Sequence, residues 1–190
     1  MPRLKRQNEA IKDERRQEIM LAATPLFAIY SPLGVTMDMV ADEAKCSHGL
    51  LYHYFHNVDE IYQNIVNSLE IKNLKEKLFL VREEVTAGQE LYIITKKLID
   101  NLGLDRISSS RLLLVMNENG TGSLREHLAK LIKEGQNEKD VVGGDPDDVA
   151  KTYLLVFKGY LLNYLLIKKY NEDRPNIDVV YEIFKKRSRI

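Results

Sequence analysis

Several features that would define a class of protein are scarce or missing from this sequence. It has one cysteine, Cys46, and no tryptophan. No disulfide can therefore form within the chain, and zinc sites that need two or more of its thiolates are excluded. The 28 lysines and arginines balance the 28 aspartates and glutamates, which excludes a strongly basic nucleic-acid coat protein or an acidic tail protein. No segment alternates apolar and polar residues as a half-buried strand does.

Long hydrophobic runs are also scarce. The N-terminus is polar and lacks the apolar core of a signal peptide. The most apolar stretch, residues 153–170, is interrupted by Lys158 and Asn163. Because a membrane-spanning helix needs about 20 mostly apolar residues, this stretch predicts a buried or interface helix. We expect a soluble, cytoplasmic protein with no membrane partner.

Apolar residues recur at helical spacing along nearly the whole chain. Ile19, Ala23 and Tyr30 share one face of the first long segment, and residues 31–34 then break the pattern. The further helices that the spacing predicts are residues 36–44, 47–55, 57–78, 89–102, 108–117, 123–136, 146–170 and 177–187. The sequence therefore predicts an all-α fold of about nine helices.

Two short helices in residues 35–55 make the most informative pattern. Thr36 and Ser47 are candidate N-caps, because their side-chain oxygens can accept a hydrogen bond from the first turn of a helix. Lys45 and Cys46 would form a tight turn between the two helices. Such a pair is a helix-turn-helix, whose second helix enters the major groove of DNA. From spacing alone, any pair of short packed helices fits this pattern equally well.

The second short helix carries residue types that suit a nucleic-acid surface. Gly49 would let a backbone or sugar come close, and Tyr52 and His53 are suited to phosphate contacts. The run Leu51–Phe55 (LYHYF) completes the segment.

Residues 19–62 resemble the DNA-binding domain of the tetracycline-repressor (TetR) family of transcriptional regulators. The resemblance covers about the first third of the chain, and the run LYHYF is its most specific piece. It implies an all-α protein with a three-helix helix-turn-helix DNA-binding domain and a basic N-terminal arm in residues 1–60. Residues 61–190 would then form a helical ligand-binding and dimerisation domain. The candidate DNA contacts are Thr36, Met37, Lys45, Ser47, His48, Gly49, Leu50, Tyr52, His53 and His56.

The function that the resemblance implies is a ligand-responsive transcription regulator, here expected to be a repressor. It would bind a double-stranded DNA operator as a homodimer and be released by a small-molecule effector, with no cofactor. The sequence contains no G-x-S-x-G, no H-E-x-x-H and no phosphate-binding glycine-rich loop, so we do not expect an enzyme.

The sequence departs from the family in the charge of the DNA-facing segment. His48 stands where the family usually has lysine, Leu50 where it has threonine or serine, and Lys45 where it has the turn glycine. Residues 31–60 hold one lysine and no arginine against five acidic residues, whereas DNA-binding surfaces ordinarily gather cations. An alternative is therefore a diverged helical interaction module with the same fold that no longer binds DNA specifically.

Two features could supply the missing positive charge. The N-terminal arm holds six basic residues against three acidic ones. Protonation of His48, His53 and His56 would add charge below neutral pH. These histidines are poorly spaced for a metal, and we expect no metal site.

The C-terminal helices offer candidate residues for the ligand-binding site and for the dimer interface. Aromatic and polar residues that could line a mostly apolar cavity are Tyr92, Met116, Asn117, Phe157, Tyr160, Asn163 and Tyr164. They include few charges, which favours a lipophilic ligand. The helix at residues 146–170 is apolar nearly all round, so a second subunit would cover its excess apolar surface. The candidate dimer contacts are Val149, Tyr153, Val156, Ile167, Ile177, Val180, Tyr181 and Phe184.

Overall fold

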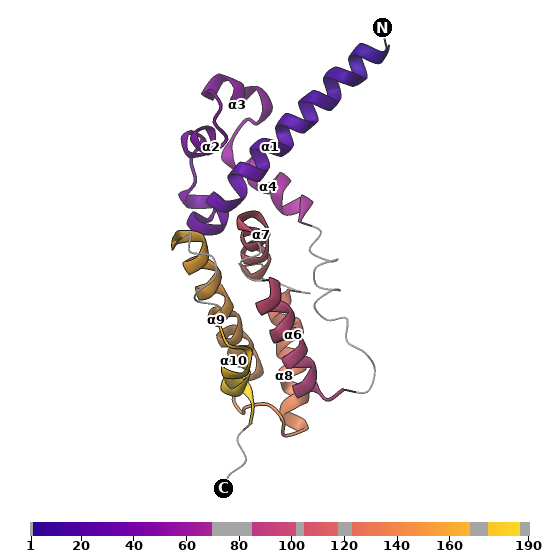
Figure 1. Cartoon of the computed structure of the whole chain (residues 1–190), viewed down its shortest axis with the longest axis vertical. Helices are drawn as coiled ribbons and strands as arrows, with labels where there is room; N and C mark the ends of the chain where they lie inside the picture. The colour runs from indigo at the N-terminus through magenta and orange to yellow at the C-terminus, as the bar shows by residue number, and fades with distance from the viewer. Residues whose placement is uncertain (1, 70–84, 102–104, 118–122, 168–174, 187–190) are drawn as a thin grey trace. The chain divides into compact units, whose positions relative to one another are not determined.

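The computed structural model describes residues 2–69, 85–101, 105–117, 123–167 and 175–186. Within these ranges it contains nine α-helices and one isolated β-bridge (Figure 1). The all-α fold that the sequence predicts is therefore confirmed. The chain divides into two compact units, an N-terminal unit, Met1–Leu69, and a C-terminal unit, Glu70–Ile190.

The described part of the N-terminal unit has four helices. They are α1 (Pro2–Gly34), α2 (Met37–Glu43), α3 (His48–Tyr54) and α4 (Val58–Ser68). α2 packs against α1 and α3, and α4 packs against α1. Because of this contact α4 falls in the N-terminal unit, which ends at Leu69 rather than at the boundary after residue 60 that the sequence suggested.

α1 differs from the sequence prediction at its N-terminal end. It begins at Pro2, so the basic segment expected as an arm ahead of the first helix is helical. No proline or glycine interrupts residues 3–24 to prevent this. The break predicted at residues 31–34 is present, because Ser31 has a φ of 58° and a ψ of 165°. Pro32 follows directly, and a residue before proline is disfavoured in the helical region.

The next three helices begin at capping residues, of which the sequence identified Thr36 and Ser47 as caps and Asn57 only as the start of a helix. The side-chain oxygens of Thr36, Ser47 and Asn57 each accept a hydrogen bond from the backbone N–H three residues further on, at 3.2, 3.2 and 2.8 Å. Each bond satisfies one of the N–H groups that the start of a helix leaves unpaired. The helix predicted at residues 57–78 is described only as far as Ser68, and the rest of that prediction lies outside the described residues.

Apolar side chains from all four helices form the core of the N-terminal unit. Phe27 packs against Tyr62, with 5.2 Å between the ring centres. Phe27 is buried, as are these further residues of the core: Ile19, Ala23, Val40, Leu51, Phe55 and Ile61.

The described part of the C-terminal unit has five helices. They are α6 (Ala87–Asn101), α7 (Arg106–Asn117), α8 (Leu124–Asn137), α9 (Pro146–Ile167) and α10 (Ile177–Phe184). α9 packs against α7 and α8, and α6 packs against α8 and α10 (Figure 1). α9 therefore packs along two other helices of its own unit, and its Tyr153 also contacts residues of α6 and α10.

A buried aromatic cluster lies at the centre of the C-terminal unit. The ring of Tyr153 on α9 lies 5.0 Å from the rings of Phe157 and Phe184, between ring centres. Its hydroxyl is hydrogen-bonded to the hydroxyl of Thr95 on α6 at 2.8 Å. Burial raises the pKa of the Tyr153 hydroxyl. The partner satisfies a polar group that would otherwise be costly to bury.

α10 is joined to the loop between α8 and α9 by backbone hydrogen bonds. The N–H of Val142 donates to the carbonyl of Phe184 at 2.8 Å, and the N–H of Lys186 donates to the carbonyl of Asp140 at 3.0 Å. The loop passes close to α8, because a Cβ atom at Gly135 would lie 2.4 Å from a methyl carbon of Val141. Only glycine fits at this position without a shift of the loop.

Candidate functional site

The helix-turn-helix predicted at residues 35–55 is present as α2, a tight turn and α3. In the turn, the N–H of Cys46 donates to the carbonyl of Ala41 at 3.0 Å. Lys45 adopts the left-handed conformation, with a φ of 50°, which glycine adopts at the least cost. The backbone therefore has the geometry of a glycine turn, although a lysine occupies it.

α3 packs one side against its own unit and leaves the other side open. Leu51 is fully buried, and so is Phe55, which caps the helix. The exposed residues in and beside α3 include these predicted DNA contacts: Ser47, His48, Gly49, Leu50, Tyr52, His53 and His56. Thr36 and Lys45 are exposed as well. All of these side chains are accessible to a partner.

Met37 is a correction to the predicted set. Its side chain is 9% exposed and belongs to the core. Because Thr36 caps α2, the helix presents Met37, Val40 and Ala41 on one inward face, at the spacing of one helical side. Met37 therefore supports the position of α2 and is not available to contact DNA.

His48 and Asp38 connect the two helices of the motif. The Nδ1 atom of His48, at the start of α3, lies 3.2 Å from a carboxylate oxygen of Asp38 in α2. Both side chains are exposed. A protonated imidazole would carry its charge beside this carboxylate, so protonation of His48 adds less net positive potential than an isolated lysine would.

Arg16 is turned into the N-terminal unit and is not free for DNA. Its guanidinium donates to the carbonyl of Tyr54, lies 3.4 Å from a carboxylate oxygen of Glu60 and stacks 4.2 Å above the centre of the Phe55 ring. The Glu60 carboxylate accepts hydrogen bonds from the backbone N–H of His56 and from this guanidinium. These two bonds hold the pKa of the Glu60 carboxyl below its usual value. Arg16 thus ties α1 to the end of α3 and the start of α4.

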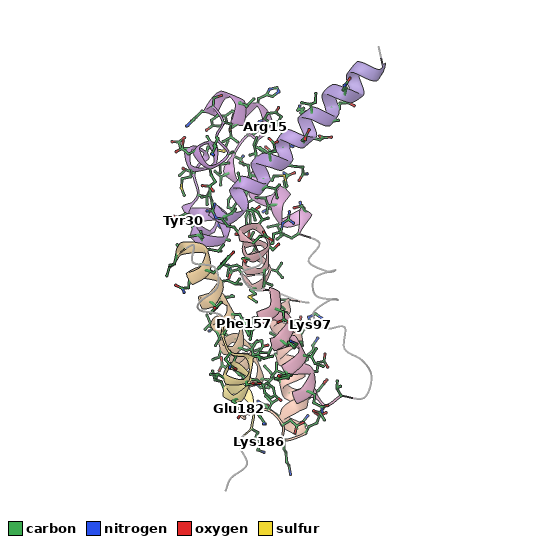
Figure 2. The ribbon with its side chains drawn as sticks, in the orientation of Figure 1. Arg15, Tyr30, Lys97, Phe157, Glu182 and Lys186 are labelled. Carbon is green, nitrogen blue, oxygen red and sulfur yellow. The ribbon has the colours of Figure 1, made fainter. Side chains whose placement is uncertain are left out.

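From the sequence, Arg16 was expected among the six basic residues of the N-terminal arm. A signal for its inward position exists, because Arg16 precedes Ile19 and Ala23 at the spacing of the buried face of α1. Arg15, the preceding residue on α1 (Figure 2), forms an exposed pair with Glu18. Among the basic arm residues whose side chains the structure describes, Arg15 and Arg16 therefore have carboxylate partners within the unit.

Gly49 has no explanation in the packing of the chain. It lies inside α3, where glycine is less stable than alanine by about 0.5–1 kcal/mol. A Cβ atom there would meet nothing within 4 Å, and the residue does not have a positive φ. Neither sterics nor backbone conformation within the chain demands a glycine at this exposed position.

The predicted ligand residues of the C-terminal unit lie in different environments. Phe157 is fully buried among the helices (Figure 2), and Met116 and Tyr164 are buried too. Asn117 and Asn163 are exposed. The remaining two, Tyr92 and Tyr160, are half-buried. The set is therefore divided between core and surface.

Tyr92 makes contacts that fix α10 on α6. Its hydroxyl lies 3.4 Å from a carboxylate oxygen of Asp178, and its ring lies 5.0 Å from that of Tyr181. The Tyr181 hydroxyl in turn donates to the carbonyl of Gly88 at 3.0 Å. These contacts give Tyr92 a structural role within the unit.

A surface hollow of about 610 Å³ lies between α8 and the start of α9. None of the predicted ligand residues lines it. Its charged lining residues are Arg125, Glu126, Lys130, Lys133, Asp145 and Asp147. Cations and anions alternate there and pair with one another, as in the 3.2 Å contact of Arg125 with Asp147.

The predicted dimer contacts are corrected in part. Tyr153, Val180 and Phe184 are buried within the chain, so they are not available to a second subunit. Val149, Val156, Ile177 and Tyr181 are half-buried, and Ile167 is exposed. Other large apolar side chains of α9 and α10 are 55–63% exposed instead, namely Leu155, Leu166, Val179 and Ile183.

In the described ranges, no helix combines the length and apolar character that crossing a membrane requires. In the same part of the chain, no three or more His, Cys, Asp or Glu side chains form a group able to hold a metal ion, and this includes His48, His53 and His56.

Comparison with known proteins finds relatives for the N-terminal unit. Residues 19–65 match the family model described as "Bacterial regulatory proteins, tetR family". The HTH-type transcriptional regulator HbdR of Aromatoleum sp. (strain CIB) is 39% identical over 62 residues, which are 30% of this chain and 27% of HbdR. The uncharacterised HTH-type transcriptional regulator YhgD of Bacillus subtilis (strain 168) is 34% identical over 64 residues, 34% of this chain and 33% of YhgD.

The chain therefore spans about a third or less of the length of these two relatives. A solved structure of AibR in complex with isovaleryl coenzyme A and operator DNA resembles most of the chain. It has a TM-score of 0.55 at 16% identity and covers 88% of this chain and 94% of AibR. At this identity the likeness concerns the fold. The helix-turn-helix of this chain is therefore similar to that of the TetR family of bacterial regulatory proteins, over residues 19–65.

Proposed function

We propose that the protein is a ligand-responsive, DNA-binding transcription regulator that acts in the cytoplasm as a repressor. The observation that carries the proposal is the open side of α3 in a helix-turn-helix that matches the TetR family model. α3 enters the major groove, and the residues at its N-terminal end meet base edges. Members of this family are regulators and not enzymes, in keeping with the expectation from the sequence.

The DNA contacts in this proposal are the exposed residues of the motif. Ser47, Gly49 and Leu50 lie at the start of α3, while Tyr52 and His53 lie further along. Serine and tyrosine hydroxyls suit the phosphates, which position the protein without reading sequence. Lys45 in the turn supplies a cation at the same surface.

The protein acts on its operator as a homodimer in this proposal, because two half-sites about 34 Å apart need two copies of α3. The dimer contacts are the exposed apolar residues of α9 and α10. Leu155 and Leu166 lie on one face of α9, three helical turns apart, and Val179 and Ile183 lie one turn apart on α10. Large apolar side chains exposed in this way favour burial by another surface.

Substitution of the exposed face tests the dimer. Leu155→Glu places a charge in the proposed contact, so we expect sedimentation velocity to show a shift from dimer toward monomer and operator affinity to fall. Gln17→Glu adds the same charge at an exposed position of α1 and should leave the dimer intact. An unchanged dimer in Leu155→Glu would place the interface elsewhere.

The C-terminal unit is the proposed ligand-binding domain, and the effector is a small lipophilic molecule. The AibR structure supports a ligand-responsive regulator of this fold, since it holds isovaleryl coenzyme A together with operator DNA. An effector that binds one dimer geometry more tightly than the other shifts the population toward it and lowers operator affinity.

A second candidate function is an interaction module that has lost specific DNA binding. The charge of the helix-turn-helix favours it, because residues 31–60 hold one lysine and five acidic residues and Arg16 is engaged within the unit. DNA binding draws much of its affinity from cations that release counterions. Its dependence on salt therefore distinguishes the two functions.

The proposed function is tested by fluorescence anisotropy with the full-length protein. Duplexes that tile the DNA around its own gene are titrated at several salt concentrations. Tight binding of one duplex, weakened steeply by salt, is expected of a sequence-specific regulator. Equal, weak binding to all duplexes, followed by a genome-wide selection that enriches no motif, would contradict the proposal and favour the interaction module.

A further inference from the structure

We infer that Leu50 contacts the methyl group of a thymine in the major groove, so that each operator half-site carries a thymine at this position. This inference rests on the proposed function, because it concerns how α3 recognises its DNA. It goes beyond that function by assigning a base to one side chain.

α3 lacks the side chains that most often read base edges through hydrogen bonds. Arginine and lysine pair with guanine, and asparagine and glutamine pair with adenine, through two hydrogen bonds each. None of these four residue types occurs in residues 46–56. The side chains open to solvent on α3 are instead those of His48, Leu50, Tyr52 and His53.

The polar members of this set have other partners or suit other contacts. Nδ1 of His48 lies 3.2 Å from the Asp38 carboxylate, which occupies one of its two nitrogens. The ring of His53 makes an edge contact with Tyr54, with 5.2 Å between ring centres. Tyr52 is 52% exposed and carries its hydroxyl at the end of a long side chain, which suits a phosphate.

Leu50 is the large apolar side chain at the N-terminal end of α3 that is open to solvent, with 37% of its surface exposed. This end of a recognition helix is the part that meets base edges. The neighbouring Gly49 has no side chain, and space is open around it, since a Cβ atom there would meet nothing within 4 Å. DNA can therefore approach the backbone at Gly49 closely enough to reach Leu50.

The chemistry of the major groove selects the base. Thymine presents a methyl group there, whereas the other base edges present hydrogen-bond donors and acceptors. A leucine placed against those polar groups would remove them from water without a hydrogen bond, which is unfavourable. Against the thymine methyl it buries apolar surface on both partners, which is favourable.

The test removes the thymine methyl group and the Leu50 side chain, separately and together, and compares the DNA affinities. Full-length protein is first used to select its preferred sequence from randomised duplexes at low salt. Each thymine of that sequence is then replaced in turn by deoxyuridine, which lacks only the methyl group. Affinities are measured for the parent protein and for Leu50→Ala.

At one thymine in each half-site, replacement by deoxyuridine should lower the DNA affinity of the parent protein about fourfold. This is the factor expected for one buried methyl group. The same replacement should leave Leu50→Ala unchanged. Tyr52→Phe is the matched control on α3: it should bind more weakly to every duplex and keep the full deoxyuridine effect. A circular-dichroism melt of each variant verifies that it is folded.

The outcomes separate this inference from the proposed function. A selection that enriches no sequence contradicts the proposed function and this inference with it. An enriched motif without a thymine, or deoxyuridine effects that are the same in the parent and in Leu50→Ala, contradicts the inference alone and leaves sequence-specific binding in place.

Discussion

The guanidinium carbon of Arg16 lies 4.2 Å from the centre of the Phe55 ring, although Arg16 lies in α1 and Phe55 follows α3. This contact joins α1 to the residue that ends α3. The same guanidinium donates to the carbonyl of Tyr54 and pairs with Glu60. Arg16 therefore contributes to the orientation of α3 on α1, together with the buried side chains Leu51 and Phe55.

Arg16→Lys is expected to destabilise the protein. A lysine keeps the charge but loses the planar group that stacks on Phe55 while it bonds Tyr54 and Glu60. We expect the free energy of unfolding in urea to fall by about 1–2 kcal/mol, since a stacked and hydrogen-bonded cation is worth that much. Arg15→Lys is the control, because an exposed ion pair contributes little. Equal losses in both variants would contradict the role given to Arg16.

Gly49→Ala is expected to change stability and DNA binding in opposite directions. Alanine is favoured over glycine in a helix by up to about 1 kcal/mol, and nothing in the chain obstructs a Cβ atom at this position. The melting temperature should therefore rise while affinity for the selected operator falls. Gly143→Ala, an exposed position with similar space around it, should leave DNA affinity unchanged. Unaltered operator binding by Gly49→Ala would show that DNA does not approach there.

Lys45→Gly separates backbone strain from charge. Glycine adopts the left-handed conformation of this turn without the cost of about 1–2 kcal/mol that other residues incur, and its greater flexibility when unfolded offsets part of the gain. We expect a net gain of up to about 1 kcal/mol in the free energy of unfolding. The salt slope of DNA binding should fall by about one, as for loss of one phosphate contact.

Lys45→Gln is the matched control for this position. It keeps the strained backbone and removes the charge, so its stability should resemble that of the parent protein while its DNA binding resembles that of Lys45→Gly. A salt slope unchanged in both variants would show that Lys45 does not contact a phosphate.

Glu90→Gln is expected to stabilise the C-terminal unit at neutral pH. Burial raises the pKa of the Glu90 carboxyl, and the nearby Glu134 raises it further, while Lys97 lowers it. A carboxyl whose pKa is higher in the folded state opposes folding once it is ionised. That opposition appears as the pH rises from the unfolded-state pKa of 4.5 through the folded value.

The measurement is urea unfolding at a series of pH values. Glu90→Gln should exceed the parent in stability at pH 7, and the difference should vanish below pH 4.5, where the parent carboxyl is protonated in both states. Glu9→Gln removes an exposed carboxylate of α1 and should not show this pattern. A difference that persists at acid pH would point to a cause other than ionisation.

The features of the fold that were predictable from the sequence are the local ones. Thr36 and Ser47 were identified as N-caps because a cap depends on residues within one turn of it. The break at Ser31 was identified for the same reason, since Pro32 acts on its neighbour. The helix-turn-helix followed from these signals together with the resemblance to the TetR family.

The faces of α9 were not predictable, because leucine and aromatic residues surround nearly the whole helix. Tyr153 was expected to face a second subunit, yet it lies against Phe157 and Phe184 inside the chain. Leu155, two residues further on, is exposed. When no polar side marks the outside of a helix, its orientation is decided by the neighbours it packs against, and these are distant in sequence.

The candidate DNA surface was predictable from the sequence only in part. The exposure of Gly49, Leu50 and Tyr52 follows from the position of Leu51 in the core, which the motif indicates. The inward position of Arg16 depends on Tyr54 and Glu60, which lie 38 and 44 positions further along the chain. A count of charges along the sequence could not distinguish a cation that serves the fold from one that serves a partner.

The contact between α10 and the loop before α9 has a consequence for the local dynamics of the chain. The amide protons of Val142 and Lys186 are both held by it, at 2.8 and 3.0 Å to their acceptors, although 44 positions separate them. A helix of eight residues such as α10 does not persist alone in water. The two amides should thus become accessible to solvent deuterium in one cooperative opening, with the same opening free energy, whenever α10 detaches.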